Sequence, residues 1–128
     1  MSTFTNEVVA IFNKEFSAIA DKFIILELSV EEAEKSKKEH IYHPGVYVWL
    51  HPTYGILRVG RSLSNSQKRA LEHIRDDTGN QMKKFGSDLE TRLMLFNIID
   101  PDANHWAAAL EIYFEKRLHP KIKAKKLG

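Results

Sequence analysis

Five side chains between residues 47 and 111 carry groups that could act together on a substrate. They are a phenol, two guanidinium groups, an imidazole and a carboxylate, supplied by Tyr47, Arg58, Arg69, His73 and Glu111. Guanidinium groups bind phosphate oxygens through paired hydrogen bonds. A phenol or an imidazole can move a proton, and a carboxylate can hold a hard cation such as Mg²⁺. Together these groups could bind an anion, hold a cation and move a proton, provided that the fold gathers them.

Each of these residues also has an ordinary structural explanation. Arg69 and His73 are four positions apart on a predicted helix, so their side chains share one face. Alone, Arg69 would be a surface residue paired with Glu72, and His73 would be a neutral, partly buried ring. Tyr47 alone would be a half-buried strand tyrosine. The chemical hypothesis therefore depends on the whole set.

Two glutamates compete for the role of cation ligand. Glu111 stands between Leu110 and Ile112 beside an apolar helical stripe, and Glu115 follows one turn later. A carboxylate that a core shields on one side is costly unless a cation or hydrogen bonds satisfy it. Like charges at this spacing repel slightly, so a bound cation would relieve the pair. The alternative is that neither glutamate binds a cation and both lie on the solvent-exposed edge of the helix.

A β-hairpin is predicted around Tyr47 and Arg58. Residues 46–50 and 56–60 are rich in β-branched, aromatic and other apolar side chains, which is typical of strands. Residues 51–55 read His-Pro-Thr-Tyr-Gly, a composition typical of a turn. The hairpin would place the two strands side by side.

Downstream of the hairpin, the pattern predicts a helix, a third strand and a last helix. Ser64 and Gln67 form a capping-box pattern that would open the first of these helices. Residues 92–99 are nearly continuous in apolar side chains, as in a strand. The Asp100-Pro101 pair is typical of a helix start, and Pro120 would end that helix.

Residues 1–43 are predicted to be a helical extension that packs on the core. Thr5 can cap a helix that runs toward Asp21, and Ser29 with Glu32 forms a capping box for a short surface helix. Residues 23–28 form an apolar run that fits either a strand or the end of a helix. We therefore expect an α+β fold with a small three-stranded antiparallel sheet flanked by helices, in which residues 44–128 form the main domain.

The composition is that of an ordinary globular protein of one domain. The chain has 128 residues, of which 43% are apolar and 28% charged, with a formal net charge of +2. It contains no cysteine, which excludes a disulfide, a thiolate metal site and a cysteine nucleophile. No apolar run approaches the roughly 20 residues of a membrane span, and the first residues lack the basic start of a signal peptide. We therefore expect a soluble, cytoplasmic protein without a membrane partner.

Cationic residues gather near the C-terminal end, where no acid follows Glu115. Such a tail could meet phosphates, or it could simply be a solvated, frayed terminus. The residues are Lys116, Arg117, Lys121, Lys123, Lys125 and Lys126.

The motif residues, in their order and spacing, resemble the GIY-YIG nuclease superfamily over about residues 44–123. Gly45-Val46-Tyr47 looks like the first motif, and Arg58-Val59-Gly60, followed by Arg61-Ser62, looks like the second. Arg69 and His73 match the arginine and histidine of the family's helix. Glu111 matches the metal-binding glutamate, because an apolar helical stretch and then Pro120 follow at the family's distance. Glu115 does not have that spacing.

The resemblance implies a divalent-metal-dependent endonuclease that hydrolyses nucleic acid, and we expect DNA rather than RNA as the substrate. Tyr47 would act as general base, Arg69 would hold the scissile phosphate, and Glu111 would hold Mg²⁺ or Mn²⁺. His73 would orient Tyr47, contact the phosphate or relay a proton. Arg61 and Lys123 would help to bind the substrate. Specificity would be loose, or would come from a homodimer or a protein partner.

Two positions depart from the family pattern. Arg58 stands where the second motif usually begins with tyrosine, and Lys123 stands where the family often has asparagine. We hypothesise that Arg58 joins the catalytic set by lowering the pKa of Tyr47, since nearby cations favour the phenolate. The departures leave two alternatives open, a catalytically weakened nucleic-acid-binding module with this fold and a small α+β interaction domain.

Overall fold

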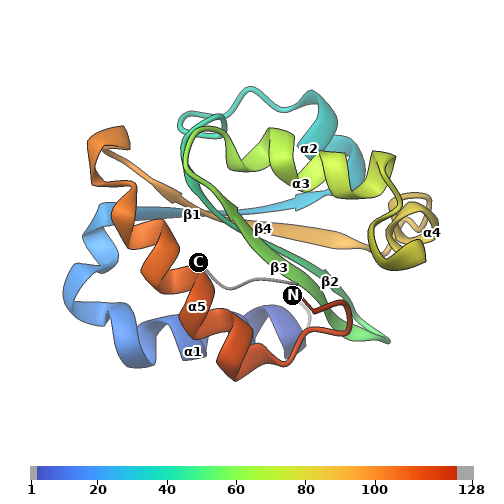
Figure 1. Cartoon of the computed structure of the whole chain (residues 1–128), viewed down its shortest axis with the longest axis horizontal. Coiled ribbons are helices and arrows are strands. Elements are labelled where there is room, and N and C mark those ends of the chain that lie inside the picture. The colour runs from blue at the N-terminus through green and yellow to red at the C-terminus, as the bar shows by residue number, and fades with distance from the viewer. Residues whose placement is uncertain (1–2, 124–128) are drawn as a thin grey trace.

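A four-stranded antiparallel sheet forms the centre of the protein, seen in a computed structural model that describes residues 3–123 (Figure 1). The order of the strands across the sheet is β1-β4-β2-β3, so β4 and β2 are central and β1 and β3 are the edges. The strands are β1 (Phe23–Ser29), β2 (Gly45–His51), β3 (Gly55–Ser62) and β4 (Arg92–Ile98).

Helices cover both faces of this sheet (Figure 1). One face carries α1 (Thr3–Phe16) and α5 (His105–Leu118). The other carries α2 (Val30–Lys35), α3 (Ser66–Arg75) and α4 (Met82–Gly86). Three short 3₁₀ segments connect these elements: η1 (Ser17–Lys22), η2 (Thr78–Asn80) and η3 (Pro101–Ala103). No helix within the described range 3–123 is long and apolar enough to cross a bilayer.

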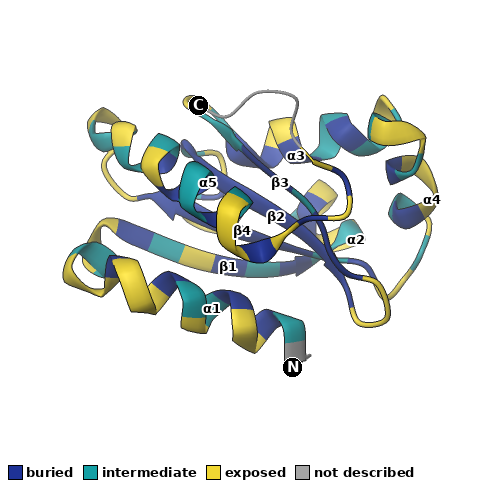
Figure 2. Cartoon of the chain, turned by 60° about the horizontal axis from the view of Figure 1, so that its bottom comes forward, coloured by how far each residue is buried: buried dark blue, intermediate teal, exposed yellow. Residues whose placement is uncertain are grey.

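Each face of the sheet has its own hydrophobic core, because successive side chains of a strand point to opposite faces. On β2, Val46 and Val48 pack toward α1 and α5, whereas Tyr47 and Trp49 pack toward α2, α3 and α4. All seven residues of β2 are buried, which explains why this strand is nearly free of polar side chains. Figure 2 shows the buried strands between helices whose outer faces are exposed.

The prediction of three strands was wrong, because residues 23–29 add a fourth. This segment pairs with β4 along its whole length, from Phe23 opposite Ile98 to Ser29 opposite Arg92. The segment before residue 44 is therefore not only helical; it supplies one edge of the sheet. The periodicity of a short apolar run does not separate a strand from a buried helix.

Two of the predicted helix starts were also wrong in detail. Thr5 lies inside α1 rather than at its cap, and this helix gives way at Phe16 to a 3₁₀ segment that ends at Lys22. Asn65, not Ser64, caps α3, because its side chain accepts a hydrogen bond from the Lys68 amide at 3.0 Å.

Of the other two predicted helix starts, the first agrees with the structure and the second agrees only in part. Ser29 and Glu32 form the predicted capping box, with bonds of 2.8 and 3.1 Å, and α2 follows. Asp100 accepts a hydrogen bond from the Asp102 amide at 3.0 Å. That cap opens the 3₁₀ segment η3, and α5 begins only at His105.

Residues after α5 carry the chain across the outer edge of β3. The Lys121 amide donates to the Ile56 carbonyl at 2.9 Å, and the Ile122 amide donates to the Leu57 carbonyl at 2.8 Å. Ile122 is buried in the core beneath α3 and α4, on the opposite face of the sheet from α5. Residues 120–123 thus close the edge of the sheet next to the candidate site.

Candidate active site

A cleft of about 710 Å³ lies beside β3 and gathers every site residue that the sequence singled out. These residues come from β2, β3, α3, α5 and the segment after α5. They are Tyr47, Arg58, Arg61, Arg69, His73, Glu111 and Lys123.

The glycine of the second motif makes room for Tyr47. Gly60 on β3 lies directly opposite Tyr47 on β2, and a Cβ on Gly60 would overlap the Tyr47 hydroxyl. Tyr47 is only 2% exposed, so its ring has nowhere else to go. The spacing of the two motifs therefore has a steric reason: one supplies the phenol and the other the space for it.

The glycine of the first motif lets a buried asparagine fix the start of α3. Gly45 lies opposite Asn97 on β4, and a Cβ on Gly45 would overlap the Asn97 side chain. The Asn97 Oδ1 accepts a hydrogen bond from Ser66 Oγ at 2.5 Å, and Nδ2 donates to the His40 carbonyl at 2.8 Å. Because Ser66 is the first residue of α3, this bond anchors the helix that carries Arg69 and His73.

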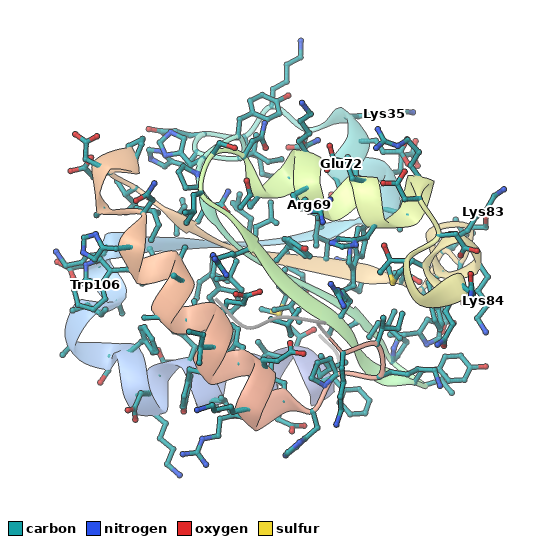
Figure 3. The ribbon with its side chains drawn as sticks, in the orientation of Figure 1. Lys35, Arg69, Glu72, Lys83, Lys84 and Trp106 are labelled. Carbon is teal, nitrogen blue, oxygen red and sulfur yellow. The ribbon has the colours of Figure 1, made fainter. Side chains whose placement is uncertain are left out.

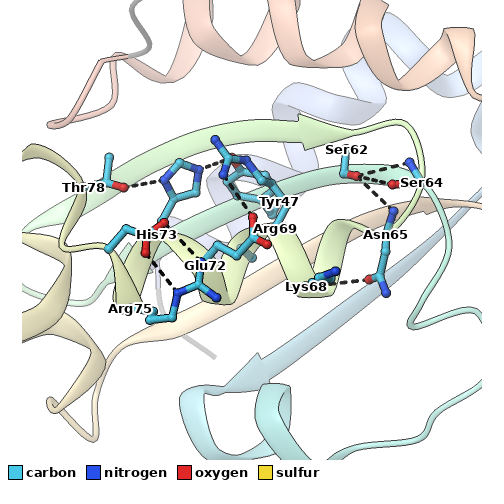
Figure 4. Close-up of polar contacts among 12 residues, drawn as sticks. Tyr47, Ser62, Ser64, Asn65, Lys68, Arg69, Glu72, His73, Arg75 and Thr78 are labelled. Atoms are coloured by element: carbon cyan, nitrogen blue, oxygen red, sulfur yellow. Dashed lines mark hydrogen bonds and ion pairs between the residues drawn. The ribbon is translucent and has the colours of Figure 1, made fainter.

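Tyr47 and His73 form a direct, buried hydrogen bond. The Tyr47 hydroxyl lies 2.5 Å from Nε2 of His73, and His73 is 3% exposed. The other ring nitrogen, Nδ1, lies 2.6 Å from Oγ1 of Thr78 on η2. Figure 4 shows the three side chains in line, with His73 in the middle.

Burial sets the protonation of this pair. It raises the pKa of Tyr47 to about 12, although the charges of Arg58 and Arg69 pull that pKa down. It lowers the pKa of His73 to about 4, and here the two arginines act in the same direction as burial. At neutral pH Tyr47 is therefore a neutral phenol and His73 a neutral imidazole.

The expected direction of the Arg58 effect is confirmed, because Arg58 lowers the pKa of Tyr47, but the net pKa is nevertheless raised. Arg58 does lie on the same face of the sheet as Tyr47, because it pairs with Trp49, two residues further along β2. Loss of water around the ring outweighs its charge.

Arg58 has a second, structural contact that the sequence did not suggest. Its Nη1 donates to the Lys123 carbonyl at 2.8 Å and to the Ile122 carbonyl at 3.4 Å. Arg58 and Lys123, the two positions that differ from the GIY-YIG pattern, therefore touch each other. The guanidinium of Arg58 ties down the backbone of the segment after α5.

Arg69 lies at the open side of the cleft. It forms an ion pair with Glu72 at 3.1 Å, and its side chain is 47% exposed. Figure 3 labels both side chains on α3. Both the surface pairing and the cleft position considered from the sequence are therefore present. An exposed pair of this kind typically stabilises a protein by less than about 1 kcal/mol, so Arg69 could turn toward an anion in the cleft at little cost.

Glu111 is 5% exposed and forms an ion pair with Arg61. Arg61 lies opposite Val46, on the face of β3 that looks toward α5. The pair uses Oε1, one of the two carboxylate oxygens. Glu115 lies one turn further along α5 and is not among the described residues of the cleft wall, so the two glutamates differ in position.

The charge of the cleft favours an anionic ligand. Within the described wall, four cationic residues face a single carboxylate, that of Glu111. The cations are Arg58, Arg61, Arg69 and Lys123. A concave surface lined by one sign of charge concentrates ligands of the opposite sign.

The donors present fit a divalent cation only if a ligand completes its shell. Over residues 3–123, no three histidine, aspartate or glutamate side chains gather into a metal site. Mg²⁺, however, is often held by one or two carboxylates together with substrate phosphates and water. Glu111 fits that requirement, with Arg61 as a competing cation.

Sequence reasoning missed two polar residues of this region. Asn97 interrupts a run of β4 that is apolar from Leu93 to Phe96, and a lone amide in such a run is a usable signal of a buried hydrogen-bond network. Thr78 gave no signal, because the residues around it are mostly polar and match no motif.

Comparisons of the chain with protein-family models, with curated proteins and with solved structures found no match. The resemblance to GIY-YIG nucleases therefore stays a prediction from the motif residues.

Proposed function

We propose that this protein is a divalent-cation-dependent endonuclease that hydrolyses phosphodiester bonds in DNA. The observation that carries the proposal is the convergence of Tyr47, Arg69, His73 and Glu111 on one cationic cleft, although Tyr47 and Glu111 are 64 positions apart in the sequence. A phenol, a phosphate-binding guanidinium, an imidazole and a carboxylate at one place form a set that suits phosphodiester hydrolysis.

The arginines bind and polarise the substrate in this proposal. Arg69 exchanges Glu72 for a phosphate oxygen, and its planar fork of donors suits the charge that develops on the equatorial oxygens. Arg61 lies on the opposite side of the cleft and is the second phosphate ligand. A Mg²⁺ or Mn²⁺ ion held by Glu111 would stabilise charge on the phosphate and on the leaving oxygen.

Tyr47 and His73 move the proton. Tyr47 is a neutral phenol at neutral pH, so it accepts a proton from the attacking water only as it gives its own proton away. His73 Nε2, 2.5 Å from the hydroxyl, is positioned to receive it. Of the three roles considered for His73, the geometry favours the relay.

The proposal is tested by nicking of supercoiled plasmid with Mg²⁺ and with chelator. We expect Mg²⁺-dependent nicking by the wild-type protein and a loss of about 100-fold or more in Glu111→Gln, because the charge that holds the cation is removed. Glu115→Gln, one turn further along the same helix and outside the cleft wall, is the matched control and should keep wild-type activity. Nicking that survives both Glu111→Gln and Arg69→Ala would come from a contaminant and would overturn the mechanism.

A second candidate, a nucleic-acid-binding module with weakened catalysis, is favoured by one contact. Arg61 already occupies the carboxylate of Glu111 and competes with a metal ion for it. This candidate predicts salt-dependent DNA binding in the absence of any Mg²⁺-dependent cleavage. If the protein neither binds nor cleaves DNA, a small α+β interaction domain is the remaining explanation.

A further inference from the structure

The hydrogen bond between His73 and Thr78 has no role in the function proposed so far. A neutral imidazole carries one N–H, so only one of its nitrogens can donate. Two assignments fit the distances of 2.5 Å to Tyr47 and 2.6 Å to Thr78. Either Nδ1 donates to Thr78 while Nε2 accepts from Tyr47, or both bonds run the other way.

The surroundings of Tyr47 favour one of these assignments. Three charged groups act on its pKa: Arg58 and Arg69 are guanidinium groups, which donate and never accept, and the Glu111 carboxylate is paired with Arg61. The phenol keeps its proton at neutral pH, and that proton needs an acceptor. His73 Nε2 lies at hydrogen-bonding distance to receive it, which leaves the ring proton on Nδ1.

We propose that Thr78 is a positioning residue: its Oγ1 accepts the Nδ1–H of His73 and so holds the ring in the tautomer whose Nε2 lone pair faces Tyr47. The effect of this arrangement on catalysis rests on the proposed function, whereas the tautomer itself does not. Hydrogen bonding at one ring nitrogen is a usual way for proteins to set the state of the other.

The turn around Thr78 is built to hold this hydroxyl in place. Its neighbours Asp77 and Gly79 have φ of 51° and 66°, and Asn80 has φ of 58°, all in the left-handed region. Such backbone costs about 1–2 kcal/mol at each non-glycine residue, so other contacts must maintain it. The Asn80 amide donates to the Asp77 carbonyl at 2.8 Å, and the Lys83 amide donates to Asp77 Oδ1 at 3.0 Å.

Ile122 supports the same turn from the other side. A Cβ on Gly79 would lie 2.8 Å from Cγ2 of Ile122, so these residues are already in close contact. Ile122 is in turn held by two hydrogen bonds. Its backbone amide donates to β3, and its carbonyl accepts from Arg58. The position of Thr78 is thus set by η2 and by the segment after α5 together.

The chemical step balances as follows. A water proton passes to Tyr47 Oη as the proton of Tyr47 passes to His73 Nε2. The water oxygen forms the new P–O bond, the P–O3′ bond breaks, and its electron pair leaves with O3′, which takes a proton from solvent. His73, now an imidazolium, keeps donating Nδ1–H to Thr78 and then releases its Nε2 proton to solvent.

The test reads the tautomer directly, in the protein without substrate. Long-range ¹H–¹⁵N correlation spectra of the imidazole at neutral pH tell a protonated ring nitrogen from an unprotonated one. We expect the proton of His73 on Nδ1 in the wild type, a shift of population toward Nε2–H in Thr78→Val, and the wild-type pattern again in Thr78→Ser. Thr53→Val makes the same chemical change at an exposed threonine and should leave His73 unaltered.

A wild-type ring protonated on Nε2, or a Thr78→Val spectrum that matches the wild type, would overturn the proposal. In the nicking assay, Thr78→Val should lower kcat by about tenfold with little change in KM, and Thr78→Ser should recover it. If the wild type shows no cleavage, the proposed function is wrong. The spectra would still show whether Thr78 sets the tautomer of His73.

Discussion

At the scale of single residues, the glycines of the two motifs have as clear a physical role as the groups that could do chemistry. Gly60 leaves space for the Tyr47 hydroxyl, and Gly45 leaves space for the Asn97 side chain. The position of the Tyr47 phenol and the position of α3, which carries His73, both require that these two residues have no Cβ.

Replacing Gly60 by alanine should destabilise the protein by about 1–3 kcal/mol, the usual cost of overpacking a core. The same replacement in a Tyr47→Val background should cost much less, because the ring that the methyl group overlaps is gone. Urea unfolding of the four proteins in this cycle measures the coupling between the two sites. Equal costs in the two backgrounds would contradict the packing described here.

His73 should make stability depend on pH in the mildly acidic range. Burial, Arg58 and Arg69 lower its pKa from 6.5 to about 4, against opposing contributions from Asp76 and Glu72. Between those pH values the unfolded chain binds a proton that the folded protein excludes. The contribution is therefore complete above about pH 6.5 and is lost progressively as the pH falls toward about 4. Denaturant unfolding at several pH values should show a shallower dependence in His73→Gln, and an unchanged dependence would refute this assignment.

At the scale of elements, how much the sequence could predict depended on how much of the signal was local. The hairpin and α3 were predictable because alternation, turn composition and helical spacing are properties of neighbouring residues. The cap of α3 was misplaced by one residue, since Ser64 and Asn65 are both good cap types and only the backbone decides between them.

The parts that were missed depend on distant contacts. Strand β1 is defined by its pairing with β4, some 70 residues away, and its own pattern fits a helix end equally well. Thr78 acquires its role from a left-handed turn packed against Ile122, which no local pattern reveals. The candidate site could be predicted as a set of residue types, whereas the hydrogen bonds that orient them could not.

The segment after α5 should be held by Arg58 as an element of the fold. Arg58→Met removes the donors to the Ile122 and Lys123 carbonyls. We expect faster hydrogen exchange at the amides of Lys121 and Ile122, which pair with β3, and unchanged exchange at the amides of β4. Arg92→Met makes the same change on β4, which β2 separates from β3 and from this segment, and is the matched control. Unchanged protection of both amides in Arg58→Met would contradict a clamping role.

At the scale of the whole molecule, the two layers of helices leave the edge strand β3 between them, and the cleft opens there. Tyr47 and His73 reach it from the side of α3, whereas Arg61 and Glu111 reach it from the side of α5. The segment after α5 crosses this edge and closes one end of the cleft. A site split between the two layers exists only when the whole fold is assembled, which ties the proposed chemistry to the complete domain.

The most direct test of this account is the rate of plasmid nicking by Tyr47→Phe, a change that removes one oxygen from the centre of the site. The account predicts Mg²⁺-dependent nicking by the wild type and a loss of about 100-fold or more in Tyr47→Phe. Far-ultraviolet circular dichroism should show the same secondary structure in both proteins. Wild-type nicking by Tyr47→Phe, or a wild-type protein that binds DNA and never cuts it, would contradict the claim that this cleft hydrolyses phosphodiester bonds.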